Sequence, residues 1–366
     1  SELVCGGEGG AAELTVTSSG PWTLIGEADW CEPSVRSGDS GGTIRFTTVE
    51  NAGTESRTAM FTVVCGPKKA AVTITQPVSN QPSIIYYTSK DAVLVEPYLG
   101  DVAQVVSNTY ELGEGGKIVL DRRIDQIPYR MFYRNQALLS VVIPEGVTMI
   151  IGGSFMGCTN LSSVTLPQTT TLLGGGSSYL GGGGAFSGCT SLSSIVIPAA
   201  VTEIGAEVFP GCTALKEVIF SEDSRLETIG FSAFSGCTGL TEFSFPNSLK
   251  TICGGAFAGC TGLTHLTIPT GVKIEDGWLI STDGTPNGAF QNCTGLESVV
   301  LPEDMVALGD NAFFGCTRLS SVILPETLQD IGANAFNRCE SLVEITIPAS
   351  VRIIQDGVQF YQIEEL

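Results

Sequence analysis

The chain has 366 residues, which is enough for two ordinary domains or for one domain followed by a repeat array. Hydrophobic residues make up 43% and charged residues 15%, so the composition indicates a globular and not a disordered protein. Eighteen basic against 38 acidic residues give a net charge of −20. This balance excludes nucleic acid as a partner, because its phosphates must be met by clustered lysine and arginine.

Residues 1–79 contain short stretches in which apolar and polar residues alternate, separated by turn signals such as Ser40-Gly-Gly42. The alternating stretches are Leu14-Thr-Val16, Ile44-Arg-Phe46, Ala59-Met-Phe61-Thr-Val63 and Val72-Thr-Ile74. Several short strands at this spacing predict an immunoglobulin-like β-sandwich.

The same segment resembles the BACON domain. The matching features are Trp22, Trp30, Asn51 with Arg57 six residues on, and the closing residues 72–76. The resemblance implies a small module found at the N-terminus of secreted gut-bacterial glycan-degrading and surface proteins, and it implies carbohydrate binding. Trp22 and Trp30 are therefore candidates for stacking on a sugar. The alternative is that both tryptophans fill the core of the sandwich.

Residues 77–83 form a linker rich in turn-forming residues, and residues 80–111 are assigned to this linker and an irregular lead-in. Lys117-Ile-Val-Leu-Asp121, followed by Ile124 and Ile127, is interpreted as a degenerate first repeat. Such a unit would cap the hydrophobic end of a stack of repeats. The third segment, 112–366, is expected to be the repeat array itself.

From residue 132 onward one pattern recurs nine times: Phe, then Leu six residues later, then Pro at plus twelve in eight of the nine units. Five of the eight intervals are 23 residues long, and the other three are 25, 31 and 33. The nine phenylalanines are Phe132, Phe155, Phe186, Phe209, Phe234, Phe257, Phe290, Phe313 and Phe336. A fixed period of this length is the signature of a solenoid.

One unit shows how such a repeat folds. Leu319, Val322 and Leu324 match the L-x-x-L-x-L strand of leucine-rich repeats, and Pro325 ends strand pairing because it lacks an amide hydrogen. A second apolar segment, Leu328-x-x-Ile331-Gly332, returns the chain to the next Phe. A single unit has too few core residues to fold alone, so neighbours must stack. Parallel strands about 4.8 Å apart would give one sheet roughly 40 Å long.

The units resemble the BspA-type leucine-rich repeat family, which reads A-F-x-G-C-T-x-L-x-x-I-x-I-P followed by V-x-x-I-G. The resemblance covers about residues 112–354. It departs from the family at Asn135, which replaces the first Cys, at Val208-Phe209-Pro210, and in two enlarged units. The expected fold class is mainly β: an immunoglobulin-like sandwich followed by a right-handed leucine-rich repeat solenoid with one parallel sheet.

Eight of the twelve cysteines occupy one position of the repeat: Cys158, Cys189, Cys212, Cys237, Cys260, Cys293, Cys316 and Cys339. A metal site needs ligands that converge on one point, whereas these run in a row. We predict free, buried thiols that behave as small hydrophobic groups. Asn135 at the same position suggests a group able to cap a turn. A bridge between Cys31 and Cys65 stays open.

No motif marks a catalytic centre. His265 is the only histidine and occupies an exposed slot of a repeat strand, so no Ser-His-Asp or Cys-His arrangement can be built. The glycine-rich run 174–184 lacks the Gly-Lys-Ser/Thr ending of a phosphate loop. We therefore expect no enzyme, no cofactor and no metal; a hydrolase would require a clustered acid pair.

Two surfaces are candidates for ligand binding. The first is the outward face of the repeat strands, where His265 lies and where one column reads Val142, Thr165, Val196, Ile219, Ser244, Thr267, Val300, Ile323 and Thr346. Strand propensity alone explains β-branched residues. If Val196, Ile219, Val300 and Ile323 are solvent-exposed over several repeats, however, they form an apolar patch of the kind that marks protein interfaces.

The second candidate surface is the pair of insertions at 172–184 and 273–288. Both enter at one point of the repeat, so both are expected to project from one edge, roughly 20 Å apart along the stack. The first carries Tyr179, and the second carries Asp276, Trp278, Asp283 and Asn287. Such loops are either binding elements or variations in length without function.

The expected function is adhesion: a secreted or outer-surface bacterial protein that recognises a host or matrix protein through the solenoid. The alternative is a glycan-binding accessory protein that uses Trp22, Trp30, Trp278 or Tyr179. No apolar run is long enough to span a bilayer, and a lipid anchor upstream of Ser1 is expected.

Overall fold

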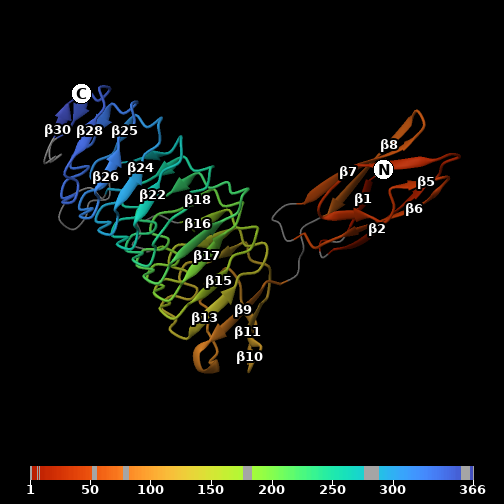
Figure 1. The fold of residues 1–366 in the computed structure, drawn as a ribbon. Helices are drawn as coiled ribbons and strands as arrows, with labels where there is room; N and C mark the ends of the chain where they lie inside the picture. Colours follow the sequence, from red (N-terminus) through yellow and green to blue (C-terminus); the bar gives the residue numbers. More distant parts are fainter. Residues whose placement is uncertain are drawn as a thin grey trace. The chain divides into compact units, whose positions relative to one another are not determined.

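A computed structural model describes residues 2–5, 7, 9–51, 56–76, 82–175, 184–275, 288–355 and 363–365 (Figure 1). Within these residues the protein is almost entirely β, with a single 3-10 turn, η1 (Lys90–Ala92). The chain divides into two compact units, Ser1–Ser83 with Asp121–Asp125 and Ile84–Leu120 with Gln126–Leu366. The expected fold class, a β-rich N-terminal domain followed by a solenoid of leucine-rich repeats, is confirmed.

The N-terminal unit is a sandwich of two sheets. The larger has the strand order β1-β8-β7-β3-β5 and the smaller the order β2-β6-β4. The strands are β1 (Glu2–Val4), β2 (Gly10–Val16), β3 (Trp22–Ile25), β4 (Cys31–Pro33), β5 (Ser37–Gly38), β6 (Gly42–Thr48), β7 (Arg57–Cys65) and β8 (Lys68–Gln76). Alternate residues of β6 and β7 point inward, and the rings of Phe46 and Phe61 meet there with centroids 4.9 Å apart.

The solenoid carries two parallel sheets where one was expected. The front sheet is built from β13 (Leu138–Val142), β15 (Ser163–Thr165), β17 (Ser194–Ile197), β19 (Glu217–Phe220), β22 (His265–Thr267), β24 (Ser298–Val300), β26 (Ser321–Ile323) and β28 (Ile345–Ile347). The back sheet is built from β12 (Gln126–Ile127), β14 (Met149–Ile151), β16 (Leu172–Gly175), β18 (Glu203–Ile204), β20 (Thr228–Ile229), β21 (Thr251–Ile252), β23 (Lys273–Ile274), β25 (Ala307–Leu308), β27 (Asp330–Ile331) and β29 (Ile353–Ile354). The apolar return segments supply these short back strands, which pair in register from β12 to β23 and again from β25 to β29.

The residues expected to form an irregular lead-in contain regular strands. β9 (Ile84–Ser89), β10 (Val105–Glu111) and β11 (Gly115–Leu120) form an antiparallel meander, and β9 also pairs antiparallel with β13. The meander therefore prolongs the front sheet and covers the N-terminal end of the solenoid. At the other end, β30 (Ile363–Glu365) pairs parallel with β28.

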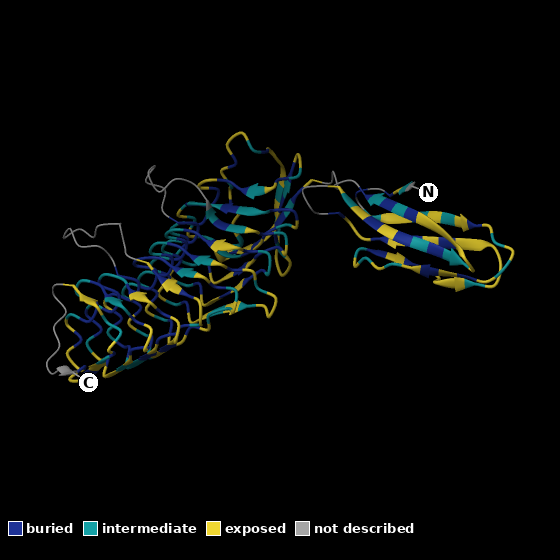
Figure 2. Ribbon diagram, turned by 90° about the horizontal axis from the view of Figure 1, so that it is seen from above, coloured by how far each residue is buried: buried dark blue, intermediate teal, exposed yellow. Residues whose placement is uncertain are grey.

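The core of the solenoid is a continuous stack of phenylalanine rings. The nine repeat phenylalanines lie one above another, with centroids 5.1–5.7 Å apart and planes within 6–24° of parallel. All nine are fully buried, as is the leucine six residues after each one, except Leu342 at the C-terminal end, which is slightly exposed. Figure 2 shows this buried interior running along the solenoid inside a half-exposed surface.

The repeat cysteines form a second internal ladder. Each of the eight thiols donates a hydrogen bond to the carbonyl oxygen of the phenylalanine one unit earlier, with Sγ–O distances of 2.9–3.2 Å. All twelve cysteines of the chain are free, and the eight ladder thiols are buried, as predicted. Asn135 occupies the first position, where no earlier Phe carbonyl exists, and its Oδ1 instead accepts the amides of Ala137 and Leu138.

We expect Phe209→Ala to destabilise the solenoid strongly, by about 3–5 kcal/mol, because it leaves a cavity between the stacked rings of Phe186 and Phe234. The matched control is Phe314→Ala, which removes a partly exposed ring that follows Phe313 of the phenylalanine stack in the sequence. Urea unfolding followed by circular dichroism measures both. Equal losses of stability in the two variants would contradict a specific contribution of the stacked rings to the stability of the solenoid.

The stability of the solenoid should fall in alkali. Burial raises the pKa of the Cys158, Cys293 and Cys339 thiols from 9.0 to about 12. Between these pH values the folded chain keeps protons that the unfolded chain releases. The contribution of these groups to the free energy of unfolding is therefore constant below about pH 9 and is lost as the pH rises toward 12.

This pH dependence is measured by urea unfolding at pH values from 8 to 11. Lysine and tyrosine also titrate in this range, so the control is Cys293→Ala, which lacks one buried thiol. Its stability should fall less steeply with pH than that of the parent chain, by up to about 1.4 kcal/mol per pH unit. An identical slope in the two proteins would show that the thiols do not contribute.

Candidate protein-binding surface

The outward face of the front sheet presents two columns of side chains. The tenth residue after each repeat phenylalanine points outward between two inward-facing residues. These residues form the outer column: Val142, Thr165, Val196, Ile219, Ser244, Thr267, Val300, Ile323 and Thr346. The residue two positions earlier forms the polar column: Ser140, Ser163, Ser194, Glu217, Glu242, His265, Ser298, Ser321 and Glu344. Parallel pairing holds both columns in register, for example Ser298 beside Ser321 and Val300 beside Ile323.

The apolar members of the outer column are exposed to solvent. Val142, Val196, Ile219, Val300 and Ile323 are between 38% and 70% exposed, and the four predicted candidates are among them. Strand propensity would be satisfied equally well by threonine, which stands at three other positions of the column. Exposed apolar residues therefore occupy five of the nine positions of the column, and they stand side by side at Val196 with Ile219 and at Val300 with Ile323.

Tyr86 adds an aromatic ring to this column. It lies opposite Val142 in the antiparallel pair of β9 and β13 and is 49% exposed, whereas its neighbours Ile85 and Tyr87 are buried. Sequence analysis missed Tyr86 because residues 80–111 were assigned to a linker and lead-in. The run of β-branched and aromatic residues in Ile84–Ser89 is the sequence signal that would have identified the strand.

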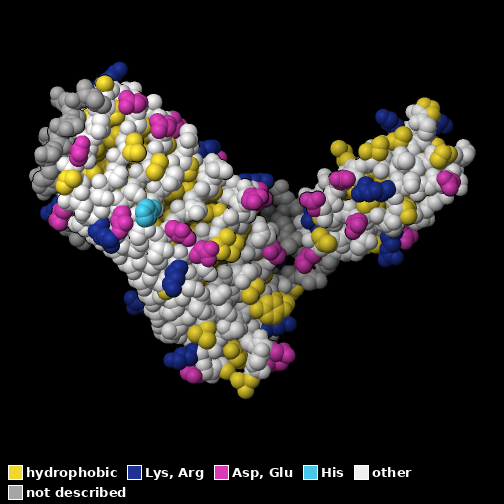
Figure 3. All heavy atoms as spheres, in the orientation of Figure 1, with side chains coloured by type: hydrophobic (Ala, Val, Ile, Leu, Met, Phe, Trp, Pro, Cys, Tyr) yellow, Lys and Arg dark blue, Asp and Glu magenta, His cyan; other side chains and the backbone are white. Residues whose placement is uncertain are grey.

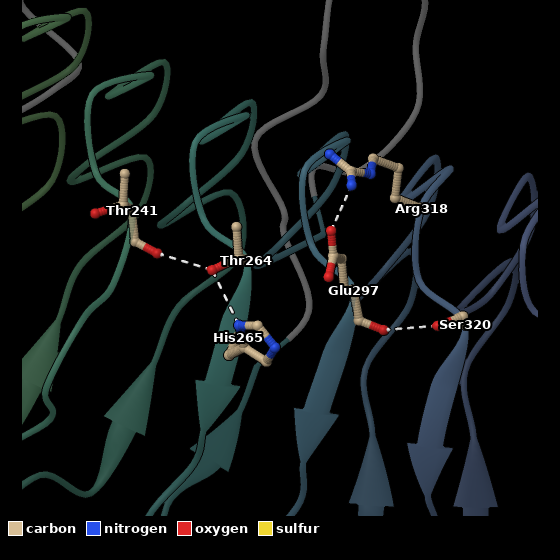
Figure 4. Close-up of polar contacts among 6 residues, drawn as sticks. All are labelled: Thr241, Thr264, His265, Glu297, Arg318 and Ser320. Carbon is tan, nitrogen blue, oxygen red and sulfur yellow. Dashed lines mark hydrogen bonds and ion pairs between the residues drawn. The ribbon is translucent and has the colours of Figure 1, made fainter.

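His265 lies exposed in the polar column, and its Nδ1 is 3.0 Å from the Thr264 hydroxyl oxygen. Figure 4 shows that the polar contacts around it run along the stack of units. The Thr264 hydroxyl donates to the Thr241 carbonyl, 3.4 Å away, and the Ser320 hydroxyl donates to the Glu297 carbonyl, 3.3 Å away. Arg318 and Glu297 form an exposed ion pair. These contacts join neighbouring units, and they leave the His265 ring on the surface.

The face around His265 combines apolar and acidic side chains. In Figure 3 hydrophobic side chains and carboxylates lie on both sides of the histidine, across the units that precede and follow it. A pocket of about 350 Å³ opens on the front sheet beside Ile219, and its lining includes Phe220, Phe245, Glu217 and Glu242. This surface can bind a partner through apolar contact and through attraction for positive charge.

The candidate residues of the two insertions, Tyr179, Asp276, Trp278 and Asp283, lie outside the described residues. The described chain leaves the back sheet at Gly175 and Glu275 and resumes at Gly184 and Gly288. At both return points a Cβ atom would lie within 1.8 Å of a backbone oxygen of the next unit. Only glycine fits where each insertion rejoins the stack.

The two tryptophans of the sandwich differ in their surroundings. Trp22 is only 3% exposed, and its indole N–H donates to the Ser40 carbonyl, 2.8 Å away. The interpretation of Trp22 as a platform for a sugar is therefore wrong, because its ring fills the core. Trp30 is half-buried, and the guanidinium of Arg57 lies 4.5 Å above the centre of its ring.

Three of the residues that carry the resemblance to the BACON domain, Asn51, Arg57 and Gln76, form one hydrogen-bonded cluster. Asn51 is buried and donates to the Gln76 carbonyl, while Arg57 donates to the Gln76 side chain and to the Val49 carbonyl. The Gln76 amide also donates to the Val49 carbonyl, at 2.8 Å. These contacts fasten the loop after β6 to strands β7 and β8, so the matching residues have a structural role.

No group of three or more histidine, cysteine, aspartate or glutamate side chains in the described part of the chain is arranged to hold a metal ion. A search of the same residues finds no helix of sufficient length and apolarity to cross a membrane.

Two family models match the chain. The model described as the BspA type leucine rich repeat region matches in six copies, over residues 112–177, 182–282 and 284–366. The model described as BACON, a putative binding domain, N-terminal, matches residues 12–77. Neither is a catalytic family. The comparison with curated proteins finds no match.

Several solved structures are similar. A leucine-rich repeat protein of T. pallidum is 28% identical, with 56% of this chain and 83% of that chain covered and a TM-score of 0.41. A leucine-rich cell surface protein of Faecalibacterium prausnitzii is 21% identical, with 71% of this chain and 85% of that chain covered and a TM-score of 0.38. A GH5 xyloglucanase of Bacteroides ovatus is 18% identical over 27% of this chain and 20% of its own, with a TM-score of 0.21. Because the repeat model covers well over half of the residues, the chain belongs to the BspA-type leucine-rich repeat family.

Proposed function

We propose that this chain is a bacterial surface protein that binds a host or matrix protein through the outer column of its front sheet. The observation that carries the proposal is the in-register exposure of Val142, Val196, Ile219, Val300 and Ile323. A stable protein interface buries about 800 Å² on each partner. A sheet of nine units about 4.8 Å apart offers a face of sufficient length for such an interface.

The charge of the chain favours a basic partner. A net charge of −20 steers a positively charged protein toward the surface, and the attraction weakens as salt screens it. Apolar contacts of the outer column would then hold the partner once it has docked. The sandwich acts in this proposal as a spacer or an auxiliary binding module.

Glycan binding is the alternative, and the sandwich gives it little support. Trp22 is buried, and one face of Trp30 is covered by Arg57. The remaining aromatic candidates, Tyr179 and Trp278, lie outside the described residues. Attachment to the cell through a lipid stays a prediction.

Replacing apolar residues of the outer column by lysine should weaken binding of the protein partner. The full chain is applied to an array of purified host-surface and matrix proteins, and the dissociation constant of its best binder is measured by biolayer interferometry. Val300→Lys combined with Ile323→Lys is expected to weaken binding at least 100-fold, because two half-exposed anchors become charged. The control Ile353→Lys changes a residue of similar exposure on the back sheet and should leave the affinity unchanged.

Retention of affinity by the double variant, or an equal loss in the Ile353 control, would refute the role of the outer column. A glycan array is run with the same proteins. Specific glycan binding that survives in the double variant, together with no binding on the protein array, would favour the alternative function.

A further inference from the structure

Pairing in the front sheet stops at three points, between β15 and β17, between β19 and β22, and between β26 and β28. The fifth unit differs from the other units because its residues 241–245 occupy the strand position of the repeat but form no strand. Three inward positions here hold phenylalanine where the other units have valine, isoleucine or leucine: Phe220, Phe243 and Phe245. These rings are larger than the side chains at the same positions of the other units, so the close-packed interior holds extra side-chain volume in the fourth and fifth units.

The three rings form a local aromatic cluster against the phenylalanine stack. Phe243 packs edge-on to Phe257 and Phe234, with centroids 4.8 and 5.3 Å apart, and it also contacts Phe245 at 4.9 Å and Phe220 at 5.9 Å. Phe243 is buried, whereas Phe220 and Phe245 are half-buried and line the pocket of about 350 Å³. The pocket is therefore a hollow with aromatic side chains in its wall, at the unit of the front sheet that lacks a strand.

The side chains around the pocket are mainly acidic. Its lining contains Glu217, Glu222 and Glu242 but only one basic residue, Lys216. Glu217 and Glu242 stand in successive units of the polar column, and both line the pocket. The ion pairs among the described residues use Asp121, Glu227 and Glu297, and no side-chain hydrogen bond involves either Glu217 or Glu242.

We propose that this pocket receives an arginine side chain of the protein partner, a step that rests on the proposed function. The guanidinium group lies between the carboxylates of Glu217 and Glu242, and its stem and planar face pack on Phe220 and Phe245. Arginine fits better than lysine because its planar fork bonds carboxylates and also stacks on aromatic rings. A divalent metal fits less well, because no metal-binding group is found among the described residues.

This arrangement assigns separate roles to the two parts of the face. The outer column provides apolar contact along the whole sheet, whereas the pocket selects partners that present arginine in an extended segment beside Ile219. A guanidinium group bound here would place its positive charge next to the carboxylates of Glu217 and Glu242.

The test uses the peptide acetyl-Thr-Val-Arg-Val-Thr-amide and its citrulline counterpart, which keeps the shape of arginine but lacks its charge. Isothermal titration with the full chain should show millimolar or tighter binding of the arginine peptide and at least tenfold weaker binding of the citrulline peptide. E217Q and E242Q are each expected to weaken binding of the arginine peptide about tenfold. The control E344Q removes a carboxylate of the same column four units beyond Glu242 and should have no effect.

Thermal unfolding monitors the fold of the variants. E217Q and E242Q should unfold at the same temperature as the parent chain, because both side chains are exposed. Equal binding of the two peptides, an equal effect of E344Q, or absence of binding by the arginine peptide would each overturn the pocket proposal.

The two proposals fail in different ways. If the peptide does not bind but the Val300 and Ile323 variant still loses the protein partner, the pocket proposal is wrong and the proposed function stands. If that variant keeps its protein partner, the proposed function is wrong, whatever the peptide does.

Discussion

Stacking of identical groups along the axis of the solenoid determines the rest of the structure. The phenylalanine rings repeat every 5.1–5.7 Å, close to the spacing of about 4.8 Å between parallel strands, so ring contact and strand pairing are satisfied by the same displacement. The thiol-to-carbonyl hydrogen bonds repeat at the same interval and fix each unit against the one before it. Any unit out of register would lose both kinds of contact.

The register of the core fixes which positions of each unit face outward, but it does not fix which residue types occupy them. Every unit must present one residue to the outer column and one to the polar column, yet no core contact decides whether that residue is Ser194, Glu217 or His265. Differences between units are therefore tolerated on the front face. They concentrate around the fourth and fifth units, where the glutamates and the additional phenylalanines meet.

The repeating residues made most of the fold predictable. The nine phenylalanines, their leucines and the thiol ladder follow from spacing alone, and so does the outer column with Val300 and Ile323. The back sheet was missed because strands of two residues, such as Asp330–Ile331, carry almost no periodic signal. Tyr86 was missed because its place depends on antiparallel pairing with β13, a long-range contact. The alternation of apolar and polar residues could not decide whether Trp22 is buried or exposed. The pocket could not be predicted either, because it depends on the volume of side chains, and a pattern of polarity does not contain that information.

The column of thiols has a consequence under oxidising conditions. An oxidised sulfur would carry added oxygen atoms into a site without free space and would lose the hydrogen that it donates to the preceding unit. Seven of the eight thiols have no exposed surface, and the last, Cys339, is 4% exposed. Solenoids open from their ends. Cys339 is therefore the member of the column that an oxidant reaches most easily, and the other seven thiols become accessible only where units of the solenoid open.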